Sequence, residues 1–498
     1  MPDEPGPASR PRAKPAPDGG SDAVLSLTPR DAAVADAVSL LSGPALDAPH
    51  PRPAPHELEA TWADQPKAGL DVLRADLAGK RLGLAISGGG SLGSFEAGAV
   101  RFLYDHASIE PAVLTGNSAG ALNAAKLAHG DRPGHERAVD SVERLWRSMR
   151  INPDMWEPEP WLERLIASAQ WASAIRGQVA DISNATSAMR IALRVVGSLV
   201  RRPEETDGTF DAVKAALNAQ SLLSLAPVMA LIEAELDADA VRESGIQLRM
   251  GVVSLESGDL RYITETGAIH DRQDRPLDLE PVALADGILA SASIPVAFPP
   301  VQLGDEHYVD GGAREILPLE LLVEHLHVER SIAISASSPT MERASSFAER
   351  NILDILRRVS AEIATNETLR KELSPPGGWG RSVRLVVPEI DVHDAMTIDP
   401  ALIAISFDYG WLRAADALLG LDAVATGLAT ELTRTRIALR RLAGPLPSLF
   451  GSDEPADQAP AWQDGAATLT ARLREQTQAL QKVGAPLPGS LLAWLDAG

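Results

Sequence analysis

The chain has 498 residues, of which 45% are hydrophobic and 23% are charged, a composition that can bury a sizeable core and excludes disorder of the bulk. Its 46 basic and 68 acidic side chains give a formal net charge of −22, which would repel phosphate backbones, so nucleic acid is not expected as a partner. The sequence contains no cysteine, which excludes disulfides, thiolate metal sites and a cysteine nucleophile.

The amino-terminal stretch, residues 1–79, is predicted to be a disordered tail rich in proline and alanine. Residues 1–60 hold 12 of the 37 prolines, and such a composition buries too little apolar surface to fold. The first twenty residues contain no apolar stretch that could form the core of a signal peptide, and nowhere do 18 uncharged apolar residues run together. We therefore expect a cytoplasmic protein.

An α/β domain is predicted over residues 80–395, because short apolar runs alternate there with glycine-rich turns and helical segments. The predicted strands cover residues 82–86, 112–115, 248–255, 331–337 and 383–388. Helical periodicity predominates between about residues 131 and 245, which predicts a cap or insertion. It returns further on, so residues 396–498 are predicted to form a C-terminal helical extension.

The sequence GNSAG, residues 116–120, follows a predicted strand and precedes a predicted helix, which is the context of a nucleophile elbow. Gly116 and Gly120 would let the backbone turn sharply and project the hydroxyl of Ser118 above the edge of the sheet. The alternative is an ordinary glycine-rich turn between a strand and a helix, and this pattern alone does not decide between the two.

A second glycine-rich segment, GGGSLG at residues 88–93, also lies between a predicted strand and a predicted helix; we call it the glycine loop. Backbone amides of such a loop can converge on an oxyanion, and its glycines are Gly88, Gly89, Gly90 and Gly93. A nucleotide phosphate loop is the alternative, but the GxxxxGK[ST] spacing is absent, which favours an oxyanion hole.

A serine nucleophile needs a base, and Asp310 is the best candidate. It ends a short apolar segment and is followed by Gly311 and Gly312, which keep its surroundings open, although Asp-Gly is also a common turn dipeptide. The sequence has ten histidines, and His325, His327 and His393 are interpreted as surface or helix-end residues.

The motifs GGGSLG, GNSAG and DGG occur here in the order that resembles the patatin-like phospholipase family. The segments SLESGDLRYIT and ASASIPVAFPPV resemble further blocks of that family, and the resemblance covers about residues 80–390. It implies a three-layer α/β fold with a mostly parallel central sheet, and a Ser-Asp dyad of Ser118 and Asp310. The glycine loop would be the oxyanion hole, and no metal or cofactor is implied.

The activity implied by this resemblance is hydrolysis of fatty acyl esters of lipids or phospholipids through an acyl-enzyme, with the amides of Gly89 and Gly90 holding the oxyanion. An acyltransferase using the same dyad, or a non-catalytic interaction protein on the same fold, are the alternatives. The sequence departs from the family at Leu92, where a basic residue is common, which puts rate and substrate in question rather than fold. Head group, acyl chain length and oligomeric state are left open.

Residues 188–202 carry four arginines and no acidic residue, an unusual stretch in an acidic chain. Apolar residues at 189, 193, 196 and 200 could share one helical face and make a peripheral membrane contact. A cap helix that packs on the core, with its arginines in solvent, is the favoured alternative because the segment is short and contains β-branched residues.

Overall fold

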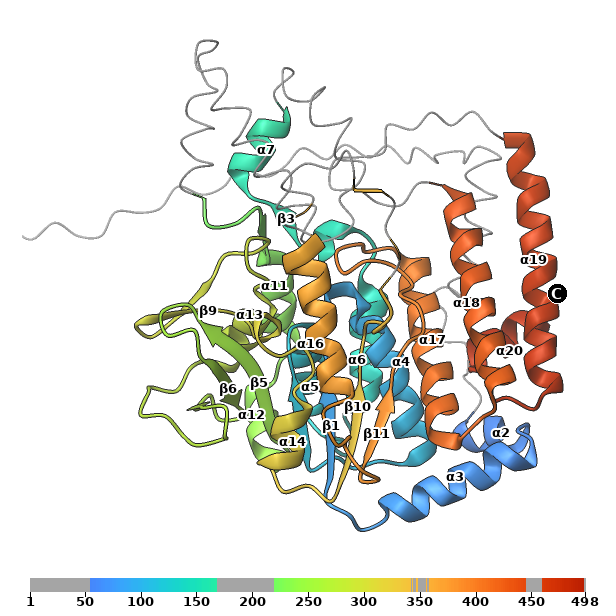
Figure 1. Ribbon diagram of the computed structural model, residues 1–498, viewed down its shortest axis with the longest axis horizontal. Helices are drawn as coiled ribbons and strands as arrows, with labels where there is room; N and C mark the ends of the chain where they lie inside the picture. Colours follow the sequence, from blue (N-terminus) through green and yellow to red (C-terminus); the bar gives the residue numbers. More distant parts are fainter. Residues whose placement is uncertain are drawn as a thin grey trace, which may run out of the picture.

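The computed structural model describes residues 54–167, 219–341, 358–444 and 459–496, together with single positions between 343 and 355. In this part of the chain nine strands form one sheet, in the order β11-β10-β1-β2-β5-β6-β7, with β9 paired to β5 and β8 to β9 (Figure 1). Its strands are β1 (Leu82–Ile86), β2 (Val113–Gly116), β5 (Gln247–Ser254), β6 (Leu260–Thr264), β7 (Ile269–His270), β8 (Val301–Leu303), β9 (Glu306–Asp310), β10 (Arg330–Ile334) and β11 (Val383–Val386). The strands from β11 to β5 are parallel and the others are added antiparallel, so the predicted α/β fold with a mostly parallel sheet is confirmed.

The sheet is the middle one of three layers. Along β1, Leu84 and Ile86 pack into one apolar core, whereas Ala85 belongs to a second core on the opposite face, as the alternation of side chains along a strand requires. The first core contains helices α4 (Gly93–Phe102), α5 (Ala119–Leu127), α6 (Ala138–Ser148), α13 (Leu284–Ala292) and α17 (Pro400–Leu419). The second core contains α14 (Leu319–Glu324) and α16 (Ala364–Leu373).

Helix α17 is part of the first core and not of an extension beyond it. A Cβ atom on Gly98 of α4 would lie 1.8 Å from the carbonyl oxygen of Phe407, and one on Gly410 would lie 1.9 Å from that of Phe95, so the two helices touch backbone to backbone. The predicted boundary at residue 396 is therefore wrong for α17, because this helix buries most of its side chains against the α/β domain.

Three further helices follow α17 and stand beside it in Figure 1: α18 (Ala423–Ala443), α19 (Ala459–Lys482) and α20 (Gly489–Asp496). Buried ion pairs attach α18 to α17. Arg436 Nη1 lies 2.8 Å from Asp408 Oδ2, and Arg440 donates to both carboxylate oxygens of Asp399, the residue that caps α17. The Arg440–Asp399 pair anchors the amino-terminal end of α17, and the Arg436–Asp408 pair anchors its middle.

The amino-terminal prediction needs a correction, because helices α2 (Pro55–Ala60) and α3 (Asp64–Leu77) lie within the predicted tail. Trp62, Leu70 and Leu73 are buried in the first core, which stabilises these helices although the segment before them is rich in proline. Gly69 of α3 lies against the backbone of Leu419 at the end of α17. Residues 1–53 of the predicted tail lie outside the described residues.

The predicted insertion is described at residues 131–167 and 219–245. Besides α6 it contains β3 (Glu157–Pro158) paired with β4 (Leu223–Ser224), and helices α7 (Pro160–Ala167), α11 (Ala226–Glu235) and α12 (Ala238–Glu243).

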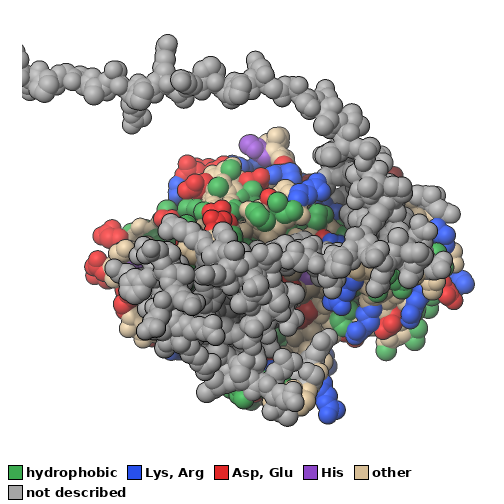
Figure 2. Space-filling view, turned by 90° about the horizontal axis from the view of Figure 1, so that it is seen from above, with side chains coloured by type: hydrophobic (Ala, Val, Ile, Leu, Met, Phe, Trp, Pro, Cys, Tyr) green, Lys and Arg blue, Asp and Glu red, His purple; other side chains and the backbone are tan. Residues whose placement is uncertain are grey.

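The segment at 188–202 lies outside the described residues, and no described helix is both long and apolar enough to cross a membrane. Acidic and basic side chains are interspersed on the described surface seen in Figure 2.

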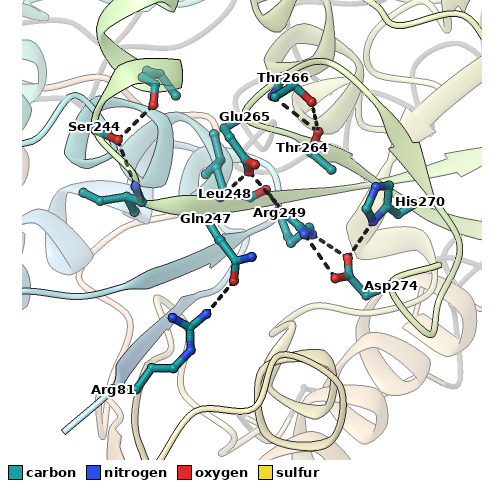
Figure 3. A network of polar contacts seen from close by, with 12 residues as sticks. Arg81, Ser244, Gln247, Leu248, Arg249, Thr264, Glu265, Thr266, His270 and Asp274 are labelled. Carbon is teal, nitrogen blue, oxygen red and sulfur yellow. Dashed lines mark hydrogen bonds and ion pairs between the residues drawn. The ribbon is translucent and has the colours of Figure 1, made fainter. Parts of the chain in front are cut away.

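Strand β5 connects the two strands that carry the candidate site. Its amino-terminal half pairs with β2, and its carboxyl-terminal half pairs with β9 along the same edge. Near the start of β5, Arg249 forms ion pairs with Asp274 and Glu265, and the Asp274 carboxylate also lies 2.9 Å from His270 Nδ1 (Figure 3). This network fastens β5 to the hairpin of β6 and β7 and so fixes the strand that holds β2 and β9 together.

Candidate active site

Ser118 stands at the sharp turn between β2 and α5. Its backbone has φ 53° and ψ −127°, a strained conformation for a residue other than glycine and typical of a nucleophile elbow. A Cβ atom on Gly116 would lie 2.3 Å from the carbonyl oxygen of Gly120, and one on Gly120 would lie 2.2 Å from that of Ser87. Both glycines are therefore sterically required, as the sequence pattern predicts.

The turn is held by contacts that the sequence does not reveal. Asn117 Oδ1 accepts from the amide of Gly251 at 3.1 Å, and Asn117 Nδ2 donates to the carbonyl of Glu315. The amide of Ser118 donates to Ser291 Oγ at 3.0 Å, and that hydroxyl donates to the carbonyl of Gly251 at 2.7 Å. A Cβ atom on Gly251 would lie 2.1 Å from Asn117 Oδ1, so a glycine in the middle of β5 lets the elbow dock.

Asp310, the last residue of β9, meets Ser118 across this junction, 192 positions later in the chain. Both residues are 4% exposed. Burial raises the pKa of Asp310 to about 6, while hydrogen bonds from the Ser118 side chain and from the amide of Gly312, at 2.7 Å, act to lower it. The carboxyl group is thus mostly ionised at pH 7 and is in contact with the hydroxyl.

The glycine loop passes above Ser118, but its four glycines are not equivalent. The amide of Gly88 donates to the carbonyl of Ile316 at 3.1 Å, and the amide of Gly93 donates to the carbonyls of Gly90 and Ser91. Gly88 and Gly93 therefore shape the loop and do not offer free donors, which corrects their predicted role. Among the described residues, the amides of Gly89 and Gly90 have no hydrogen-bond partner, and Gly90 lines a cavity together with Ser118.

A family model described as patatin-like phospholipase matches residues 84–323, a range that contains the glycine loop, the elbow and Asp310. Residues 84–323 form a patatin-like phospholipase domain. No curated protein sequence matches the chain. Among solved structures, VipD from Legionella pneumophila is similar at 14% identity and a TM-score of 0.33, covering 84% of this chain and 79% of VipD. Human GIVD cytosolic phospholipase A2 is similar at 10% identity and a TM-score of 0.30, covering 78% of this chain and 67% of that one.

The patatin-like domain has a narrow apolar cavity of about 30 Å³ at Ser118. Its walls come from the elbow helix, α13, the insertion and the segment before α17, and they include Leu122, Trp146, Met155, Leu225, Ile288 and Met396. No charged side chain is among the described residues that line it. Several methionines face it, and their flexible side chains can adapt to a chain that enters.

A buried acid links the glycine loop of the patatin-like domain to its elbow helix. Glu96 accepts from Ser87 Oγ and from Asn123 Nδ2, each at 3.0 Å, and burial raises its pKa well above the usual value. Asn123 also donates to the carbonyl of Gly93 at 3.1 Å and accepts from Trp146 Nε1 at 2.8 Å. Glu96 thus holds the loop and the helix in one arrangement.

The histidines separate into two kinds. His325 and His327 lie at and beyond the end of α14 and are half-buried and exposed, as predicted. His393 is only 7% exposed and contacts the glycine loop, so the surface interpretation was wrong for it; a histidine that folds onto a distant loop leaves no local pattern.

Leu92, at the position where the family commonly has a cation, is buried at 5% exposure, which suits an apolar side chain. Among the described residues, no group of His, Asp or Glu side chains could hold a metal ion.

Proposed function

We propose that the patatin-like domain hydrolyses fatty acyl esters of lipids, with Ser118 as nucleophile and Asp310 as its base. The family match supports lipid acyl hydrolysis in general terms. The observation that carries the finer assignment is that the buried carboxyl group of Asp310 interacts with the side chain of Ser118, which itself lines an apolar cavity.

The chemistry follows from this arrangement. Asp310 accepts the hydroxyl proton while Ser118 Oγ attacks the ester carbonyl, and the free amides of Gly89 and Gly90 stabilise the oxyanion. The C–O bond to the alcohol breaks, the alcohol leaves with the proton, and Ser118 carries the acyl group. Water, deprotonated by Asp310, then attacks the acyl-enzyme; the bond between the acyl carbon and Ser118 Oγ breaks, Oγ takes the proton back from Asp310, and the fatty acid is released. The start of α5 directly after Ser118 favours the developing negative charge.

The cavity supports recognition of the acyl chain rather than of a charged head group. Its described lining is apolar, and Leu92 stands where the family commonly has a cation. A cavity needs roughly 10 to 15 Å³ to hold one water molecule, so a volume of about 30 Å³ has room for only about two water molecules and is too small for an acyl chain as it stands. Entry of a chain requires the methionine side chains to move.

The test is release of fatty acid from phospholipid vesicles and from p-nitrophenyl acyl esters by the wild type and by Ser118→Ala. We expect Ser118→Ala to lose at least about 10³-fold in kcat, since the nucleophile is removed. Ser406→Ala is the matched control: this serine of α17 is equally buried and its hydroxyl has no partner in the described part of the chain. Activity that survives in Ser118→Ala would disprove the assignment.

The alternative acyl acceptor is tested in the same assay. Adding glycerol or a lysophospholipid to the wild-type reaction separates hydrolysis from transfer, because transfer yields a new ester in place of free fatty acid. We expect free fatty acid as the main product.

A further inference from the structure

The segment at residues 393–398, which we call the strap, lies outside the matched family range yet packs against the glycine loop. The amide of Ser91 donates to the carbonyl of Ala395 at 2.9 Å, and a Cβ atom on Gly90 would lie 2.2 Å from that same oxygen. Gly90 has φ 55°, in the left-handed region, so the loop both needs a glycine there and is pressed against the strap. Met396 of the strap lines the cavity at Ser118.

The strap is itself held on several sides. Asp394 accepts from the amide of Met396 at 2.8 Å and from Thr397 Oγ1 at 2.7 Å, which fixes the turn. Trp156 Nε1 donates to the carbonyl of Met396 at 3.0 Å, and the amide of Ile398 donates to Asn152 Oδ1 at 2.7 Å. The strap therefore joins the glycine loop to the insertion and to the start of α17.

His393 provides the side-chain link between the strap and the loop. Its Nδ1 lies 2.8 Å from the carbonyl oxygen of Asp394 and 3.3 Å from Ser91 Oγ, which itself donates to that carbonyl at 2.9 Å. A carbonyl can only accept, so Nδ1 carries a proton. Nε2 is buried and has no partner among the described residues. A buried nitrogen without a hydrogen-bond partner is unfavourable. The favourable polar contacts of His393 are therefore those made by Nδ1.

We propose that His393 is a positioning residue for the oxyanion hole: through Nδ1 it fixes Ser91, and this holds the free amides of Gly89 and Gly90 over Ser118. The proposal rests on the proposed acyl hydrolase function, because an oxyanion hole has a role only in that chemistry. Gly90 directly precedes Ser91 and Gly89 precedes Gly90, and neither amide has a hydrogen-bond partner in the described structure, so the anchoring of Ser91 decides where they point. A displacement of about 1 Å at such a site is enough to cost about 10²-fold in rate.

The test uses three substitutions that separate the two ring nitrogens. His393→Asn keeps a donor near the Nδ1 position, His393→Gln moves it toward the Nε2 position, and His393→Leu has none. With the full-length chain and a p-nitrophenyl acyl ester, we expect His393→Leu and His393→Gln to lose about 10- to 100-fold in kcat with KM changed less than about threefold. His393→Asn should retain kcat within about threefold of the wild type.

A second partner and a control make the test specific. Ser91→Ala should lose at least as much as His393→Leu, because it also removes the hydrogen bond to the carbonyl of Asp394, and the double variant should lose no more than Ser91→Ala alone. His106→Asn is the matched control: His106 is as buried but lies among Trp62, Phe102 and Trp411. It should lower the unfolding temperature without a selective fall in kcat.

The outcomes distinguish this proposal from the proposed function. Labelling of Ser118 by a fluorophosphonate, in which Oγ displaces fluoride from phosphorus, gives a second measure of the oxyanion hole and is followed by intact mass. If the wild type is labelled and hydrolyses esters but His393→Leu keeps full rates in both assays, the positioning role is rejected while the function stands. Equal losses in the Asn, Gln and Leu variants, in step with lower unfolding temperatures, would also reject it. If the wild type is neither labelled nor active, both proposals fail.

Discussion

Asp310 and Glu315 flank the same turn, and burial raises the pKa of both carboxyl groups, to about 6 and to about 8. Their partners differ. Asp310 faces the hydroxyl of Ser118, whereas Glu315 accepts from the phenol of Tyr262, lies near Glu372 and uses its backbone carbonyl to hold Asn117. Burial and a raised pKa therefore do not by themselves identify a base. What a carboxyl group can do depends on the group that it touches and on whether a substrate can reach it.

The largest expected effect comes from removing the base. Asp310→Asn should lower kcat about 10³-fold, since a positioned general base contributes roughly 10² to 10⁴. Thermal unfolding measured alongside should show no loss of stability at pH 7, because the wild type there carries a buried charge that the variant lacks. Glu315→Gln is the matched control and should stay within about threefold of wild-type kcat. A larger loss in Glu315→Gln than in Asp310→Asn would reverse the assignment.

The pH dependence of activity gives an effect of intermediate size. The base must be ionised to accept a proton, so kcat/KM should rise about tenfold per pH unit below pH 6 and become flat above about pH 7. The profile is measured with a neutral p-nitrophenyl ester, and Glu315→Gln should leave it unchanged. An inflection near pH 8 that disappears in Glu315→Gln would show that the wrong carboxyl group has been assigned.

Glu315→Gln should have the smallest effect on activity, but it should change how the stability of the protein depends on pH. Because its pKa is raised in the folded state from 4.5 to about 8, the folded protein binds a proton that the unfolded chain releases. Its contribution to the free energy of unfolding is complete below about pH 4.5 and falls by roughly 1.4 kcal/mol per pH unit until about pH 8. Urea unfolding of Glu315→Gln between pH 5 and 9 should therefore show a shallower decline than the wild type. Parallel curves for the two proteins would contradict this explanation.

Much of the site could be predicted from sequence because its steric requirements are local. Gly116 and Gly120 stand beside Ser118 in a strand-turn-helix unit, and the contacts that demand them lie within that unit or at the neighbouring strand end. The three short motifs likewise predicted the family, which the match over residues 84–323 confirms. The sequence could not predict which glycines of the loop have free amides. That depends on tertiary contacts and on the shape of the loop, because the amide of Gly88 is bonded to Ile316 and the amide of Gly93 is bonded within the loop.

The remaining features depend on segments that are distant in sequence. Gly251 and Ser291 support the elbow only because β5 pairs with β2, and His393 reaches the glycine loop only because α17 packs on α4. The helices at residues 55–77 were missed for a similar reason. Their local sequence does not by itself indicate a folded segment, because Trp62, Leu70 and Leu73 stabilise it only by packing against α17 and α4.

The sequence by itself thus determined the sharp turn at Ser118, the alternation of strands and helices and the family, because short-range sterics and periodicity specify these features. The tertiary structure alone decided which amides of the glycine loop stay free and which distant residues hold the loop and the elbow. Those outcomes depend on strand register and helix packing, where groups that are hundreds of residues apart are brought within hydrogen-bond distance and no local pattern records the contact.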